Sequence, residues 1–224
     1  MHKGEFVGIN AANQRKRILI LGESHHTSND ENSPNRIVGV EATYDTKDVL
    51  AEYFADPELR NRHLRFFRNI AKCFGEFSTL SKEREAFWNN VYFGNYIDVL
   101  CGVRDTVALK QINTKGNRKK YNSQLFSFIQ ENEIDVIFCF SRKVYNKLPS
   151  LEAFDKETKG DIGDSHRLDM CEYYPGPRKG ISVSLSKPVI VYGLKHPSQG
   201  FSHRRYQGII AEIIKNEGLF NAAD

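Results

Sequence analysis

The chain has 224 residues, of which 40% are apolar, and this suits one sizeable globular domain spanning residues 1–224. No apolar run approaches the roughly 18 residues of a membrane span, and the opening "MHKGEFVGIN" lacks the apolar core of a signal peptide. We therefore expect a cytoplasmic protein with no membrane partner.

The formal net charge is +4 and the pI is near 8.8. This mild basicity permits contact with a polyanion without demanding it. The four cysteines lie far apart in the chain, and none forms a Cys-x-x-Cys pair. We predict buried free thiols rather than disulfides, and we expect neither zinc nor a cofactor.

The first predicted elements are a strand at 17–22 and a helix at 56–75. The "ILIL" of the strand is apolar throughout, which favours a strand covered on both faces. The loop "GESHHTSNDENSPNR" follows it. In the helix, Asp56 is a candidate cap, Pro57 a candidate first residue and Gly75 the end. Its arginines and Lys72 mostly fall off the apolar face, and a solvated basic face is favoured over a phosphate-binding one.

Further along, a short helix in "SKEREAFWNN" is predicted to run into a strand near Val91–Tyr96. A helix marked by Leu125, Phe128 and Ile129 precedes the buried strand "DVIFCF". Residues 150–180 are polar and are predicted to form an irregular excursion. The strand "KPVIVYGL" and a helix at 203–216 close the chain.

Strands that alternate with helices predict a three-layer α/β/α fold with a central, mostly parallel, four-stranded sheet. Ligands of such folds bind beyond the carboxyl ends of the strands. The loops after the first and last strands, "GESHHTSND" and "KHPSQGFSHRR", should open on the same edge.

The second of these loops combines groups suited to an anionic ligand. Pro197 fixes the backbone next to His196, and the amides that open the following helix can bind an anion. The hydroxyl and cationic side chains of this loop are Ser198, Ser202, Arg204 and Arg205.

"HPSQGFSHRRYQG" resembles the His-Pro-Ser-x-x-Ser signature of the uracil-DNA glycosylase superfamily. "ILILGESHH", "VYFGNYI" and "DVIFCFSRKVYNKLP" resemble other strand-end segments of that family, in the same order. The resemblance spans about residues 17–216. It implies a uracil-DNA glycosylase-like fold, DNA or another nucleobase-containing ligand as the partner, and hydrolysis of the N-glycosidic bond of an extruded base.

The resemblance also implies residue roles. His196 matches the donor that stabilises negative charge on the departing base, and Asn95 matches the amide that pairs with the base edge. Ser198 and Ser202 match phosphate-gripping positions, with Arg204 and Arg205 beside them. Phe201 matches an apolar wedge in the vacated base stack.

The first loop departs from the family pattern. Ser24 stands where one branch has a water-activating aspartate, and Glu23 matches the glutamate of another branch. His25 replaces the family proline, and His26 falls where one branch has a base-stacking tyrosine. We therefore expect Glu23 to act with His196, and His26 and Ser24 to lie near the base, while the substrate base stays open.

Other readings of "LGESHH" remain. It resembles the Gly-Glu-x-His start of hydrolases related to erythromycin esterases, with Glu23 and His25 as the acting pair. A nucleophilic Ser24 would lack an acidic orienter, because the segment before His196 reads "GLKH". A non-catalytic nucleotide- or DNA-binding module is a further alternative. A metal site of His25, His26, His196 and Glu23 is disfavoured, because adjacent histidine side chains usually diverge.

Overall fold

The computed structural model describes residues 5–26, 46–56, 64–75, 81–101, 106–149, 157–161, 167–178, 181–198 and 200–220. The protein is α/β, as predicted. Its strands are β1 (Phe6–Val7), β2 (Ile18–His26), β3 (Tyr92–Cys101), β4 (Val136–Cys139), β5 (Glu157–Asp161), β6 (Arg167–Tyr173), β7 (Gly176–Arg178), β8 (Ile181–Leu185) and β9 (Val189–Gly193). Its helices are η1 (Ala11–Asn13), α1 (Thr46–Ala55), α2 (Arg65–Cys73), α3 (Ser81–Trp88), α4 (Thr106–Asn113), α5 (Lys115–Glu131), α6 (Arg142–Tyr145) and α7 (His203–Glu217).

The main sheet has seven strands in the order β1-β3-β2-β4-β9-β6-β5. The strands β3, β2, β4 and β9 run parallel to their neighbours in that order, whereas β1, β6 and β5 pair antiparallel. The sheet is therefore mixed and wider than the four-stranded, mostly parallel sheet expected from the sequence.

Part of the extra width comes from the segment predicted to be irregular. Strand β6 pairs with β9 along Asp169–Tyr173, and β5 pairs with β6. The sequence of β6 does not predict a strand. Its buried residues Leu168 and Cys171 are separated by Asp169 and Met170, so they form no continuous apolar run. The prediction of an irregular excursion is thus wrong for these residues.

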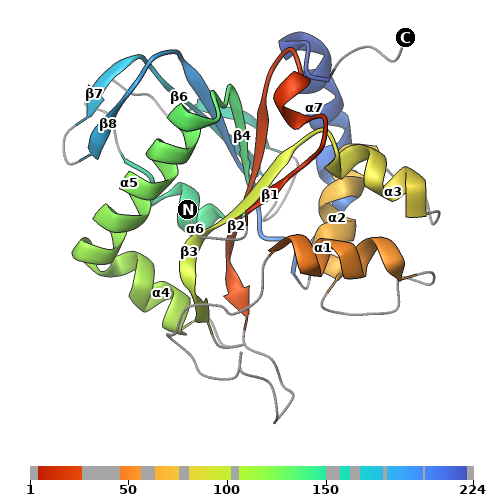
Figure 1. The fold of residues 1–224 in the computed structure, drawn as a ribbon, viewed down its shortest axis with the longest axis horizontal. Helices are drawn as coiled ribbons and strands as arrows, with labels where there is room; N and C mark the ends of the chain where they lie inside the picture. The colour runs from red at the N-terminus through yellow and green to blue at the C-terminus, as the bar shows by residue number, and fades with distance from the viewer. Residues whose placement is uncertain are drawn as a thin grey trace.

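Helices cover both faces of the sheet, with α4 and α5 on one side and α1, α2, α3 and α7 on the other (Figure 1). Two hydrophobic clusters fill the layers between them. Alternate residues of β2 enter different clusters, since Leu19 and Leu21 face the α5 side and Ile18 and Ile20 face the α2 side. This explains why residues 18–21 of the strand are all apolar.

Strand β2 is longer than the predicted 17–22. Its pairing with β3 runs on to His26↔Cys101, with a register shift between Ser24 and His25, whereas its pairing with β4 stops at Leu21↔Cys139. Residues 23–26 therefore belong to a strand rather than a loop. Strands β2 and β3 project together beyond the end of β4 and form one wall at the carboxyl edge of the sheet.

The helix predicted over 56–75 is only partly present as expected. Asp56 follows α1, where its N–H donates to the carbonyl of Glu52, so it does not cap α2. Pro57 lies outside the described residues. The predicted end is confirmed, because α2 stops at Cys73 and Gly75 adopts the left-handed backbone with φ +92°.

The four cysteines are buried free thiols, as predicted. Cys73 packs in the cluster on the α2 side, and Cys101, Cys139 and Cys171 pack in the cluster on the α5 side. Within the described ranges, no helix is long and apolar enough to cross a bilayer.

Candidate functional site

Glu23 is a buried carboxylate on β2, two residues beyond the point at which β2 stops pairing with β4. Its side chain is 6% exposed, and its Oε2 accepts a 2.6 Å hydrogen bond from the hydroxyl of Ser141. Ser141 also caps α6, since its Oγ accepts from the N–H of Val144. The strand β4 and the helix that follows it thus hold the Glu23 carboxylate in one orientation.

Asn95 lies on β3 directly opposite Gly22 of β2. Its amide is held close over the Gly22 backbone, because a Cβ built on Gly22 would overlap Asn95 Oδ1. The Nδ2 atom lies 3.4 Å from His25 Nε2, and the Asn95 side chain is 8% exposed. The missing Cβ at position 22 therefore makes the space in which this amide sits.

His196 follows β9 and reaches the same edge from the α2 side. Its ring centroid is 5.4 Å from that of Phe66 on α2, and Phe66 Cζ in turn lies beside Gly22. The loop is tied to α2 by Asn69, whose Nδ2 donates to the Pro197 carbonyl over 3.3 Å. Phe66 therefore lies between His196 and Gly22, the residue against which the amide of Asn95 packs.

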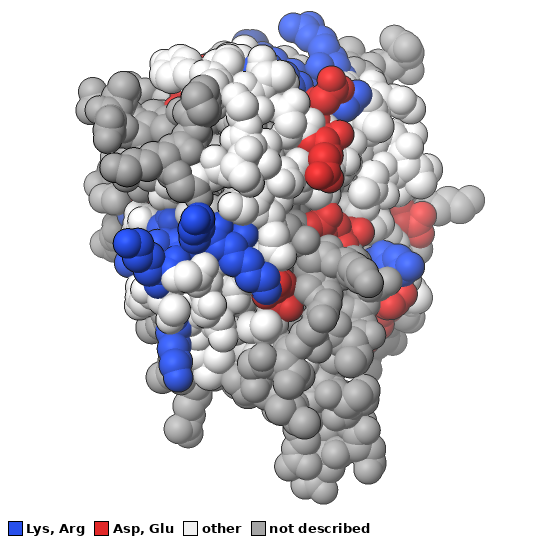
Figure 2. All heavy atoms as spheres, turned by 60° about the vertical axis from the view of Figure 1, so that its left-hand side comes forward, with Lys and Arg blue, Asp and Glu red and all other residues white. Residues whose placement is uncertain are grey.

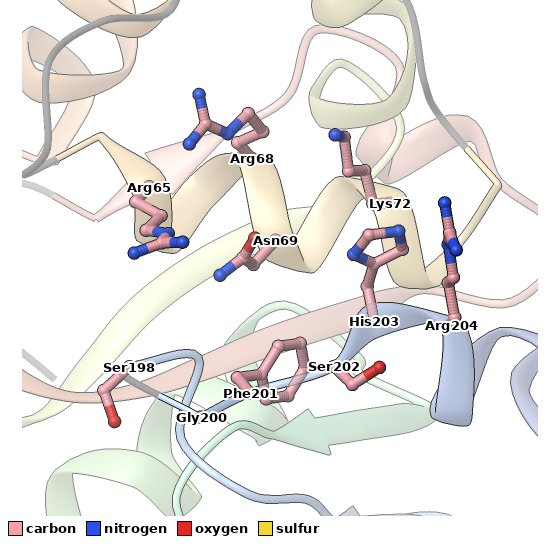
Figure 3. Close-up of a pocket in the computed structure, with 10 residues that line it drawn as sticks. All are labelled: Arg65, Arg68, Asn69, Lys72, Ser198, Gly200, Phe201, Ser202, His203 and Arg204. Carbon is pink, nitrogen blue, oxygen red and sulfur yellow. The ribbon is translucent and has the colours of Figure 1, made fainter.

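A pocket of about 590 Å³ opens between α2 and the loop that leads into α7 (Figure 3). We call it the cationic pocket. Its described lining residues are Arg65, Arg68, Asn69, Lys72, Ser198, Gly200, Phe201, Ser202, His203 and Arg204, and none of these is acidic. In Figure 3 the side chains of Lys72, His203 and Arg204 lie next to one another and point the same way.

The positive charges of the cationic pocket repel one another. Burial, and then the charges of Arg68 and Arg204, hold the pKa of Lys72 below its usual range. Burial, and then Lys72 and Arg204, likewise lower the pKa of His203. An anion between these groups would relieve the repulsion.

A second group of basic side chains gathers on the face that carries α4 and α5 (Figure 2). The first turns of α5 contribute Lys115, Arg118, Lys119 and Lys120 to this side of the molecule. Lys120 pairs there with the buried Asp98. This surface differs from the cationic pocket, because its charges lie along one helix, whereas those of the pocket come from two separate elements.

The remaining predicted site residues fall into three groups. Phe201 and Ser202 line the cationic pocket with Ser198 and Arg204, and Phe201 stacks on Tyr206 at 5.4 Å. Arg205 is exposed on α7 outside the described lining of the pocket. Ser24 lies beside the thiol of Cys101, and the backbone of His26 pairs with Cys101 in the sheet.

Sequence reasoning missed several residues of this edge. Ser141 follows the strand "DVIFCF", so the rule that ligands bind at strand ends pointed to its position. The helical pattern predicts that Phe66 packs in the core and that the cations of α2 lie on a solvated face. It does not show which loop packs against the helix. Nothing in the sequence indicates that the half-buried Arg142 pairs with the buried Asp169 over 3.4 Å, because Asp169 lies in a segment predicted to be irregular.

Neither a comparison with models of known protein families nor a search of curated protein sequences found a match to this chain. Within the described part of the chain, no group of three or more His, Cys, Asp and Glu side chains is arranged to hold a metal ion.

Proposed function

We propose that this chain is a divergent N-glycosylase of the uracil-DNA glycosylase type, which hydrolyses the bond between an extruded base and its sugar. The observation that carries the proposal is the placement of Asn95 and His196 around Gly22 and Phe66, next to the cationic pocket. An amide and an imidazole beside a phosphate-attracting surface suit a nucleic-acid substrate. Four adjacent parallel strands with helices on both faces support the finer uracil-DNA glycosylase-like layering.

The residues have distinct tasks in this proposal. Asn95 reads the edge of the base with one donor and one acceptor, in an orientation held by Gly22 and His25. His196 donates toward the carbonyl of the departing base, where negative charge develops. Glu23, oriented by Ser141, polarises the attacking water in place of the aspartate that Ser24 replaces.

An oligonucleotide assay tests the proposal. Single- and double-stranded oligonucleotides that carry uracil, hypoxanthine or xanthine are incubated with the protein, and abasic sites are detected by alkaline strand cleavage. We expect release of at least one base, and we expect His196→Ala to lower the rate on the order of 10²–10³-fold. Asn95→Ala should lose the discrimination between bases.

Lys215→Glu is a suitable control, because Lys215 is exposed at the far end of α7. It should retain wild-type excision. No excision by the wild type, or equal excision by His196→Ala, would reject the glycosylase proposal. Turnover of small activated esters that is lost in Glu23→Gln would instead favour the Gly-Glu-x-His hydrolase.

A further inference from the structure

The cationic pocket concentrates more positive charge than a single backbone phosphate requires. Arg65, Arg68 and Lys72 come from α2, and Arg204 comes from the first turn of α7. A phosphodiester carries one negative charge, whereas a terminal phosphate carries close to two at neutral pH. We propose that the cationic pocket binds a phosphomonoester, the terminal phosphate of a nucleic-acid strand or of a free nucleotide.

Cationic groups from two elements meet at one end of the pocket, where the side chains of Lys72, His203 and Arg204 lie next to one another (Figure 3). Burial is the main cause of the lowered pKa values of Lys72 and His203, and the neighbouring cations, Arg204 among them, lower both further. The repulsion between like charges from two helices is unfavourable, and a doubly charged anion bound among them would offset it.

The pocket also offers suitable donors and enough room. Arg65 and Arg204 lie at opposite ends of the pocket (Figure 3), and the guanidinium group at either end can donate two parallel hydrogen bonds to phosphate oxygens. Ser198 and Ser202 add hydroxyl groups to the lining. The volume of about 590 Å³ exceeds that of a phosphate group, and it falls within the range of sites that hold a nucleotide-sized ligand.

The pocket and the base-contacting edge share the helix α2. Phe66 packs on His196, the preceding Arg65 lines the pocket, and Asn69 bonds to the loop between the two. A nucleotide with its phosphate in the pocket would therefore have its base within reach of the strand ends. The assignment of the phosphate to a nucleic acid or nucleotide rests on the proposed function.

The test compares one short single-stranded oligonucleotide of undamaged bases with and without a 5′-phosphate. Its dissociation constant is measured by fluorescence anisotropy at moderate salt, with the fluorophore on the 3′ end. We expect the wild type to bind the phosphorylated strand on the order of 10-fold more tightly. The double variant Arg65→Glu/Arg204→Glu should reduce this ratio to about one; both side chains are exposed, so the fold should persist.

Lys119→Glu is the matched control, because it reverses a charge in the basic group on the α5 side. It should weaken both oligonucleotides alike and keep the ratio. A wild-type ratio of one, or an unchanged ratio in the double variant, would overturn the proposal. Far-UV circular dichroism of each variant verifies folding.

Competition assigns the source of the phosphate. A nucleoside monophosphate that displaces the phosphorylated strand at a similar concentration identifies free nucleotides as ligands, and a much weaker effect identifies the strand end. Both results uphold the phosphomonoester site. Because no base is excised in this experiment, a failure of the glycosylase assay would leave the ratio unaffected.

Discussion

At the scale of single residues, Gly22 sets the geometry of the candidate site. The space that a side chain would occupy at position 22 is filled by the amide of Asn95. Phe66 closes the same space from α2. Because Asn95 Oδ1 is the end of a side chain, a methyl group at position 22 would displace that amide rather than the backbone.

Gly22→Ala should therefore reproduce the functional defect of Asn95→Ala. We expect a loss of base discrimination in the excision assay and a destabilisation of about 1–3 kcal/mol from the forced displacement. The control is Gly208→Ala in α7, where an added Cβ meets open space. That change should raise the free energy of unfolding by about 0.5–1 kcal/mol. Retained base discrimination in Gly22→Ala would contradict this role of the glycine.

At the scale of secondary-structure elements, the connection from β4 to α6 is coupled to β2 through Ser141. One hydroxyl donates to Glu23 and also accepts from the N–H that opens α6. A displacement of the short helix would therefore change the orientation of the Glu23 carboxylate, which lies on a strand more than a hundred residues earlier in the chain.

Ser141→Ala should destabilise the protein by about 1–3 kcal/mol, because a buried carboxylate oxygen loses its donor. Urea unfolding followed by circular dichroism measures this change. Ser184→Ala, at an exposed position of β8, should stay within about 0.5 kcal/mol of the wild type. Equal midpoints for the two variants would show that the Ser141–Glu23 hydrogen bond adds nothing to stability.

The elements also show where sequence reasoning succeeds and where it stops. Continuous apolar runs identified the cores of β2, β4 and β9, because strands buried on both faces leave no polar position. The extension of β2 through Glu23 and His25 escaped this rule, since its polar side chains are satisfied by groups far away in the chain. The strand β6 and the edge strand β5 also escaped this rule, because neither contains an apolar run.

The candidate site was predictable to a similar degree. The rule that ligands bind beyond the carboxyl ends of parallel strands predicted that His196 and Asn95 lie at one edge of the sheet. It could not show that α2 packs against the loop of His196, because helix packing depends on contacts between distant segments. The cationic pocket is a product of that packing.

At the scale of the whole molecule, the stability should depend on pH through Glu5. Burial, with a contribution from the charge of Glu131, raises the pKa of Glu5 to about 7. In the unfolded chain the carboxyl loses its proton near 4.5, so between these values unfolding releases a proton. The free energy of unfolding therefore falls as the pH rises from about 4.5 to 7, and the loss is complete above that range.

Glu5→Gln should remove this dependence. We expect a gain of about 1 kcal/mol at pH 8, after allowance for the partial exposure of the side chain, and no gain at pH 4. Thermal unfolding at the two pH values measures it. Glu212→Gln, at an exposed position of α7, serves as the comparison. A gain from Glu5→Gln that is equal at both pH values would refute the titration as its cause.

The rates at which the buried thiols react with an alkylating reagent should report local opening of the fold. Burial raises the pKa values of Cys73, Cys101 and Cys139, that of Cys139 to about 12, so the reactive thiolate is scarce in the folded chain. Alkylating reagents must then wait for the chain to open around each sulfur. Because Cys73 lies on one side of the sheet and Cys101 and Cys139 on the other, the order in which they become labelled reports which helical layer separates first.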